Sequence, residues 1–307
     1  MSTCNPPPGN DGAFPTPPAP YPYPFLHLCT LALCTQTAAM RSLFPLLAVA
    51  AIFAADTPVP AENKVAPPKQ LRVFIRSGPK THKPGDHDHP AFLRDWVPLL
   101  IDHGASATGS ETFPTAEQLA QTDVVIIHRQ GGGDFKPEER ERITAFTKNG
   151  GGLVVIHAGS VASTPEGTDF YKELIGGSWR QKVTRYREGP MQLDFVDKTH
   201  VITARIADFK MQDEIYYEMD LRNDIHVLAS SPTPKKVGDG FEVQTQAWTY
   251  ERDAYRAFVF IPGHTYVNFQ RNDVRTLLLR GIAWAGKHPR PADFSDMVVC
   301  PPPPPIK

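Results

Sequence analysis

Residues 153–156 form a continuous run of apolar, mostly β-branched side chains, with three glycines before it and His157-Ala158-Gly159 after it. An apolar run of this length between turn signals is typical of a strand that is covered on both faces. Residues 123–127 repeat the pattern, and residues 71–76 form an earlier β-branched and aromatic strand. Such strands belong to parallel sheets with helices on both sides, so the run restricts the chain to an α/β fold.

Helical patterns separate these strands. Apolar residues recur at helical spacing between residues 92 and 101, and Gly104 is placed to end that helix. Pro137 suits the first position of a second helix that ends before Gly150, and a short third helix is expected at residues 169–175. Strands and helices that alternate with short links predict right-handed crossovers and a parallel sheet.

The second half of the chain is richer in strands. We expect them at residues 191–195, 226–229, 246–250 and 256–261, before a last helix at residues 273–285. The sequence therefore predicts an α/β three-layer sandwich with a mostly parallel sheet and extra strands in the C-terminal half.

The two ends of the chain are rich in proline and are expected to bury little apolar surface. Met40-Arg41 is followed by an apolar run and then by small residues of the kind found at a cleavage site. This is the layout of a secretory signal peptide, which predicts a periplasmic or secreted protein. We interpret residues 1–39 as an upstream mis-annotated leader; a genuine long leader with an apolar stretch inside it is the alternative. The predicted parts are residues 1–39, the signal peptide 40–55, a proline-rich linker 56–69, one domain 70–288 and a proline-rich tail 289–307.

Charge and cysteine usage narrow the function. The 307 residues carry a formal net charge of −1, so nucleic acid is not an expected partner. No apolar stretch is long enough for a stable membrane span after signal cleavage. Cys4, Cys29, Cys34 and Cys300 all lie outside residues 70–288, so a thiol nucleophile is not available to the predicted domain.

Histidines gather where predicted strands end. His82, His87 and His89 lie with two aspartates in the loop after residues 71–76, while His128 and His157 each end an apolar strand. His264 follows residues 256–261. Because the carboxyl ends of parallel strands meet at one edge of a sheet, several of these imidazoles are expected to converge.

Imidazole suits both proton transfer near neutral pH and metal ligation. We predict His157 and His264 as catalytic residues, and His82, His87 and His89 as ligands of a divalent metal such as zinc. A solvated polar loop is the alternative for the three loop histidines, and a core histidine bonded to the backbone is the alternative for His157.

Residues 213–217 (Asp-Glu-Ile-Tyr-Tyr) place two carboxylates beside two phenols, a combination that suits sugar hydroxyls and acid–base roles. We predict Glu214 as a catalytic residue, and Asp213, Tyr216, Tyr217 and His128 as substrate-binding residues. A loop that caps a strand is the equal alternative for this segment. The glycine groups at 131–133 and 150–152 fit no phosphate-binding loop, so no nucleotide cofactor is expected.

Four segments match a known family in their order along the chain and in their residue types: residues 74–76 with the His82 loop, 150–158, 213–216 and 262–265. Through them the chain resembles the ThuA-like (trehalose utilization) family over residues 70–288. The resemblance implies a flavodoxin-like fold similar to class I glutamine amidotransferases. In true amidotransferases a cysteine occupies the turn after the central strand. Here that turn reads Ile156-His157-Ala158-Gly159-Ser160, which argues against glutamine hydrolysis.

The family association implies sugar metabolism, including trehalose and keto-sugar derivatives. We therefore expect a small-molecule carbohydrate as partner and a hydrolase, lyase or isomerase that uses histidine and carboxylate acid–base or metal-assisted chemistry. One alternative is a non-catalytic sugar-binding module in which Tyr216, Tyr217, Trp179 and Trp248 supply stacking faces. A serine hydrolase with Ser160 as nucleophile is another. The sequence is compatible with a homo-oligomer and does not determine the oligomeric state.

Overall fold

A computed structural model describes residues 69–235 and 240–295. The predicted leader and signal peptide, nearly all of the proline-rich linker and most of the tail lie outside these residues. None of the helices within the described ranges has the length and apolarity needed to cross a bilayer.

The described residues contain a nine-stranded sheet with the order β2-β1-β3-β4-β11-β10-β9-β6-β7. Its first five strands run parallel; they are β2 (Ser106–Ser110), β1 (Arg72–Arg76), β3 (Val124–Ile127), β4 (Gly152–Ile156) and β11 (Tyr255–Phe260). The parallel order, with its reversal beside β1, is the order of flavodoxin-like folds. This confirms the predicted fold class.

The other half of the sheet is antiparallel. It consists of β10 (Phe241–Arg252), β9 (His226–Pro234), β6 (Arg185–Phe195) and β7 (Phe209–Tyr217). A separate two-stranded sheet pairs β5 (Gly177–Ser178) with β8 (Asp220–Leu221). The strands predicted at residues 191–195, 226–229 and 246–250 are parts of β6, β9 and β10, whereas the one predicted at residues 256–261 is the parallel strand β11.

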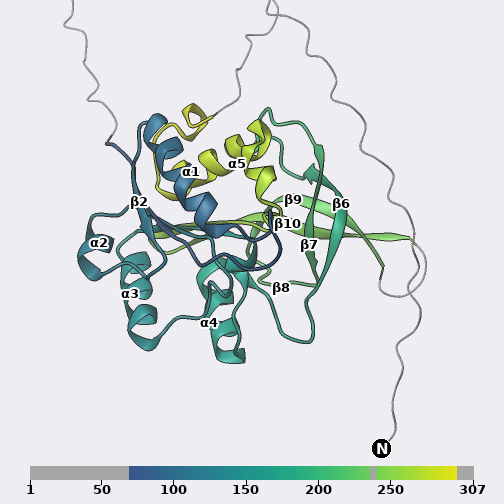
Figure 1. Ribbon diagram of the computed structural model, residues 1–307, viewed down its shortest axis with the longest axis horizontal. Coiled ribbons are helices and arrows are strands. Elements are labelled where there is room, and N and C mark those ends of the chain that lie inside the picture. The colour runs from purple at the N-terminus through teal and green to yellow at the C-terminus, as the bar shows by residue number, and fades with distance from the viewer. Residues whose placement is uncertain (1–68, 236–239, 296–307) are drawn as a thin grey trace, which may run out of the picture. The chain divides into compact units, whose positions relative to one another are not determined.

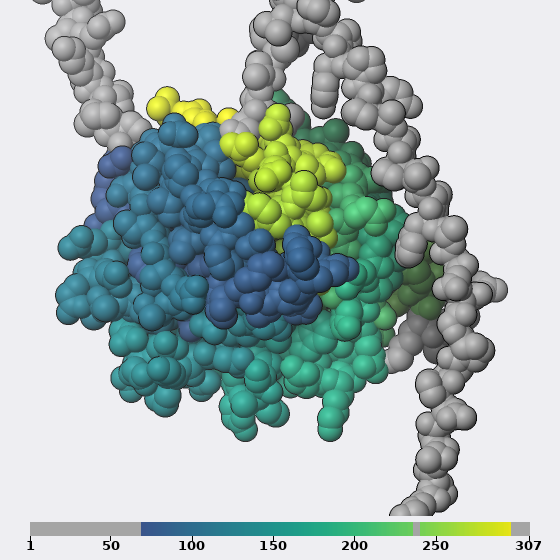
Figure 2. Space-filling model, in the orientation of Figure 1, coloured from purple at the N-terminus to yellow at the C-terminus, as the bar shows by residue number. Residues whose placement is uncertain are grey.

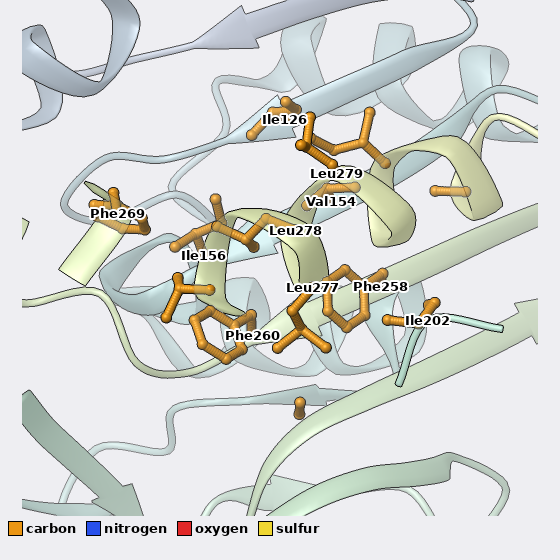
Figure 3. Packing of buried hydrophobic residues seen from close by; sticks show 14 of the residues in the cluster. Ile126, Val154, Ile156, Ile202, Phe258, Phe260, Phe269, Leu277, Leu278 and Leu279 are labelled. Atoms are coloured by element: carbon orange, nitrogen blue, oxygen red, sulfur yellow. The ribbon is translucent and has the colours of Figure 1, made fainter. Parts of the chain in front are cut away.

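Helices cover both faces of the parallel strands (Figure 1). On one face α1 (His89–Asp102) and α5 (Asn272–Ala285) pack through Phe92, Trp96 and Leu277 against Ile75 and Phe258. Figure 3 shows the consecutive leucines of α5 seated on the side chains of β3, β4 and β11. On the other face lie α2 (Ala116–Ala120), α3 (Pro137–Lys148) and α4 (Pro165–Ile175). The three predicted layers are thus present.

Several elements were not expected from the sequence, among them α2 and the short strands β5 and β8. β2 is a polar edge strand, Ser-Ala-Thr-Gly-Ser, without the apolar run that marks the other parallel strands. Residues 213–217, for which a capping loop was an equal alternative, are part of β7 instead, because pairing with β6 satisfies their backbone groups. Packing also continues past residue 288, where Phe294 is buried against the ring of His288.

Candidate metal and substrate site

The predicted convergence of histidines occurs at the carboxyl edge of the sheet. The loop after β1 carries His82 and His87, the 3-10 helix η1 (His157–Ser160) follows β4, and His264 follows β11. Glu214 joins them from β7. Figure 2 shows dark blue surface from the early part of the described chain beside the green surface of its later part. Asp86 forms an isolated β-bridge with Thr265.

Four buried side chains form a cluster: His87, His157, Glu214 and His264 each offer one ligand atom, and these atoms lie within 4.8 Å of one another. His157 Nε2 lies 2.9 Å from His87 Nε2 and 3.1 Å from Glu214 Oε2. Glu214 Oε2 in turn lies 3.2 Å from His264 Nδ1. We call these four residues the His/Glu cluster.

Backbone conformation holds three histidines of this region in place. His82, His87 and His157 adopt left-handed φ angles of 62°, 43° and 51°. Non-glycine residues take this conformation at a cost of about 1–3 kcal/mol, and such residues concentrate at functional sites. The strain therefore favours a functional role for these positions over a role in packing alone.

A hydrogen bond orients the ring of His157. Its Nδ1 lies 2.8 Å from the carbonyl oxygen of Ile261, and a carbonyl only accepts, so Nδ1 carries the proton. In the neutral ring Nε2 then presents its lone pair to the cluster. This arrangement of one nitrogen on a backbone carbonyl and the other free to ligate is typical of metal-binding histidines.

Asp213 holds the turn that carries His264. Its buried Oδ1 accepts from the backbone N–H groups of Gly263, at 3.2 Å, and His264, at 2.9 Å. Its Oδ2 accepts from Asn268 Nδ2 at 2.7 Å. Burial raises the pKa of Asp213 above its usual value. Asp213 does not line the pocket described below, so the structure places it as a positioning residue rather than beside a ligand.

The electrostatics of the cluster couple Glu214 to two imidazoles. Burial would raise the pKa of Glu214, but its contacts with His157 and His264 outweigh this and lower it. Burial would likewise lower the pKa of His264, but Glu214 and Asp86 outweigh this and raise it. For His87, burial and the neighbouring His157 lower the pKa to about 2.

The geometry of the cluster fits a metal ion. Ligand atoms about 2.0–2.1 Å from a tetrahedral ion lie about 3.3–3.4 Å apart. Three pairs in the cluster have separations of 2.9, 3.1 and 3.2 Å, close to this value, and all pairs lie within 4.8 Å. Both ring nitrogens of His264 and Oδ2 of Asp86 are buried, yet they form no well-directed hydrogen bond among the described residues. His264 Nε2 lies 3.1 Å from that Asp86 oxygen. The cluster can therefore hold a metal through imidazole and carboxylate donors.

A pocket of about 280 Å³ opens beside the cluster. His87, Glu214 and His264 line it, whereas His157 is buried behind them. The β6–β7 ribbon forms one wall, since Tyr186 pairs with Tyr216 and Glu188 pairs with Glu214 across the two strands. The remaining lining residues are His82, Gln130, Val161, Trp179 and Gln181.

The aromatic side chains of the wall are in contact with one another. The Trp179 ring lies 4.9 Å from that of Tyr216 and 6.4 Å from that of Tyr186, centroid to centroid. The Tyr216 hydroxyl lies 3.3 Å from His157 Nε2. Burial raises the pKa of Tyr216 well above its usual value, so this hydroxyl keeps its proton at neutral pH.

Three other predicted site residues, His89, His128 and Tyr217, lie outside the pocket lining. His89 is buried and bonds the carbonyl of Pro79 through Nδ1 at 3.0 Å. His128 is buried between the rings of Phe92 and Phe269. Tyr217 follows Tyr216 on β7, and successive side chains of a strand point to opposite faces. His82 lines the pocket, with its ring centroid 4.0 Å from that of His87, but lies outside the four-residue cluster.

Sequence reasoning did not single out Tyr186, Glu188, Gln130 or Gln181. Tyr186 and Glu188 occupy the first part of β6, where the sequence Arg-Tyr-Arg-Glu-Gly-Pro has no strand alternation, and we expected this strand to begin at residue 191. Gln130 follows β3, so its place at a strand end is the same signal that marked the histidines.

A larger hollow of about 660 Å³ lies at the opposite edge of the sheet. Its lining contains no histidine, and its one carboxylate, Asp123, is bonded to Lys69 and Arg72. Of these two hollows, the one at the carboxyl edge is thus the one lined by imidazoles.

Comparisons with known proteins agree with this architecture. Residues 68–285 match the family model described as ThuA, trehalose utilisation. A solved ThuA-like protein from Bacteroides uniformis is 20% identical, with a TM-score of 0.57 over 74% of this chain and 95% of that one. A ThuA-like protein from Parabacteroides merdae is also 20% identical, with a TM-score of 0.55 over 71% of this chain and 90% of that one.

A cytoplasmic protein from Salmonella typhimurium has a TM-score of 0.50 at 13% identity, over 70% of this chain and 98% of that one. At these identities the solved structures establish the fold. The search of curated proteins found no match. The family match spans most of the chain, and the chain therefore belongs to the ThuA (trehalose utilisation) family.

Proposed function

We propose that this protein acts on a carbohydrate at the pocket beside the His/Glu cluster, by acid–base chemistry assisted by a divalent metal. The observation that carries the proposal is the meeting of His87, His157, Glu214 and His264 within 4.8 Å, from four separate segments of the chain. Hydrolysis, elimination and isomerisation of a glycoside or keto-sugar all need proton transfers that such groups perform.

A divalent transition metal such as zinc suits the donor set of three imidazoles and one carboxylate. A bound metal would polarise a sugar oxygen as a Lewis acid. His157 would hold it from behind the pocket, with His87, Glu214 and His264 on the side that lines the pocket. His157 is then a ligand rather than a direct proton donor, because it does not line the pocket.

The wall opposite the cluster suits a sugar ring. Trp179, Tyr186 and Tyr216 offer apolar ring faces, and the amides of Gln130 and Gln181 offer donors and acceptors for hydroxyl groups. A volume of about 280 Å³ suits a small ligand, near the lower end of ordinary ligand pockets.

Other chemistries have less support. The turn after β4 contains no cysteine, which argues against glutamine hydrolysis. Ser160 is fully buried, its hydroxyl donates to the carbonyl of His157 at 2.8 Å, and it does not line the pocket. We therefore do not propose a serine hydrolase.

The test uses the full chain in zinc-loaded and chelator-treated forms. Each form is titrated calorimetrically with trehalose and glucose, and products are followed by chromatography with trehalose and keto-trehalose as substrates. We expect about one zinc per chain, saturable binding that Trp179→Ala weakens, and turnover only in the loaded form. Binding without turnover would favour the non-catalytic sugar-binding module, while absence of both would refute the proposal.

Export remains part of the proposal, on the strength of the signal-peptide pattern at residues 40–55. N-terminal sequencing of protein recovered from the periplasm or medium would test it. A chain retained in the cytoplasm with these residues intact would contradict export.

A further inference from the structure

Two carboxylates face each other across the β6–β7 ribbon. Glu188 of β6 is the register partner of Glu214 of β7, on the face that lines the pocket. Side chains directly opposite in an antiparallel pair have Cβ atoms about 4.5–5.5 Å apart, and like charges there destabilise the sheet. The pairing is therefore a cost to folding that needs another explanation.

The environment of the two carboxylates differs. The Glu214 side chain is 8% exposed and contacts two imidazoles, whereas the Glu188 side chain is 53% exposed at the mouth of the pocket. Glu188 Oε1 lies 3.9 Å from His264 Nε2, and its Oε2 lies 3.7 Å from Lys83 Nζ. Both separations exceed hydrogen-bond length, and the Lys83 side chain is 68% exposed, so these contacts hold Glu188 weakly.

Asp86 is the other carboxylate near His264, but it is buried and lies outside the pocket lining. Of the carboxylates described around the cluster, Glu188 is thus the one that combines access to a ligand with freedom from a close partner. Tyr186, two residues earlier on the same face of β6, places an aromatic ring beside it.

We propose that Glu188 is the proton-transfer carboxylate of this pocket, a role that rests on the proposed carbohydrate function. The proton of a bound sugar hydroxyl passes to a Glu188 oxygen, where a new O–H bond forms as the sugar O–H bond breaks. The electron pair stays on the sugar oxygen, which faces the His/Glu cluster. The carboxyl group returns the proton to the product when the turnover ends.

The test compares zinc-loaded Glu188→Gln, Glu188→Asp and wild-type protein, with Glu242→Gln as matched control. Glu242 lies on β10 and does not line the pocket. Turnover of trehalose and keto-trehalose is measured from pH 5 to 9, with zinc content and melting temperature recorded for each variant. We expect Glu188→Gln to lower kcat by about 10²–10⁴-fold across this pH range.

Zinc content should stay unchanged and the melting temperature should not fall in Glu188→Gln, because an unfavourable charge pair is removed. Glu188→Asp should retain part of the rate, and Glu242→Gln should match the wild type. A Glu188→Gln variant with wild-type kcat and pH profile would overturn the role of Glu188 while leaving the carbohydrate function standing. Wild-type protein that converts neither sugar would overturn both.

Discussion

Nε2 of His157 lies 2.9 Å from Nε2 of His87, although 70 residues separate them in the chain. Each ring is fixed from its other side, His157 by the carbonyl of Ile261 and His87 by the hydroxyl of Thr81 at 3.2 Å. Two buried imidazole nitrogens directed at each other beside a carboxylate form a donor set for a metal ion.

Replacing His157 with alanine should weaken zinc binding by at least about 10–100-fold. One of the four metal donors is lost, and water can then enter the space of the removed ring and reach the other three donors. Competition with a fluorescent chelator measures the affinity directly. The matched control is His226→Ala, at an exposed histidine paired with Asp197 far from the cluster. Equal zinc affinity in wild-type and His157→Ala protein would contradict the metal site.

Tyr216→Phe and Tyr217→Phe form a matched pair on β7. Tyr216 lines the pocket, and its hydroxyl, 3.3 Å from His157 Nε2, can donate to a sugar oxygen when that nitrogen holds a metal. Removing this hydroxyl should therefore weaken trehalose binding to the zinc-loaded protein by about tenfold, the size of one lost hydrogen bond. Tyr217 does not line the pocket, so its loss of a hydroxyl should leave binding unchanged. Calorimetric titration measures the binding affinity of each variant. A larger effect from Tyr217→Phe would contradict the assignment of Tyr216, rather than Tyr217, to the face of β7 that lines the pocket.

His128 should make the protein acid-sensitive. Burial lowers its pKa well below the value of 6.5 expected in the unfolded chain. Below pH 6.5 the unfolded state takes up a proton that the folded state does not, so this group lowers the free energy of unfolding by about 1.4 kcal/mol per pH unit as the pH falls.

The variant His128→Phe replaces the ring between Phe92 and Phe269 with one that cannot titrate. Urea unfolding of chelator-treated protein at pH 7.5 and pH 5.5 should show a smaller acid loss in the variant, by about 1.4 kcal/mol. Identical pH dependence in the two proteins would mean that His128 does not stay neutral in the folded state.

Gly281→Ala should destabilise the protein although alanine favours helices by about 1 kcal/mol over glycine. A Cβ at position 281 of α5 would lie 2.1 Å from Cδ1 of Phe258, on the strand beneath. We expect a loss of about 1–3 kcal/mol in the free energy of unfolding, measured in urea. The double variant Gly281→Ala/Phe258→Leu should recover part of the loss, and a stabilised single variant would contradict this packing.

The sequence by itself determined the parallel half of the fold. The apolar runs of β1, β3 and β4 mark strands buried on both faces, and Pro137 and Gly150 bracket α3 as expected, because these signals are local. The same local signals placed His87, His157 and His264 at strand ends, and the parallel arrangement then implied that they meet. Membership of the ThuA family follows from the same segments.

The tertiary structure decided which histidines belong together. His82, His87 and His89 share one loop, yet the left-handed backbone at His87 brings that ring to His157, while His89 turns to Pro79 and joins the core as the first residue of α1. The pairing of β6 with β7 likewise set Glu188 opposite Glu214 and Tyr186 opposite Tyr216. The alternation along one strand determines which face each side chain takes. It does not determine which residue of a strand about 30 positions away stands opposite, and that pairing depends on the tertiary contacts.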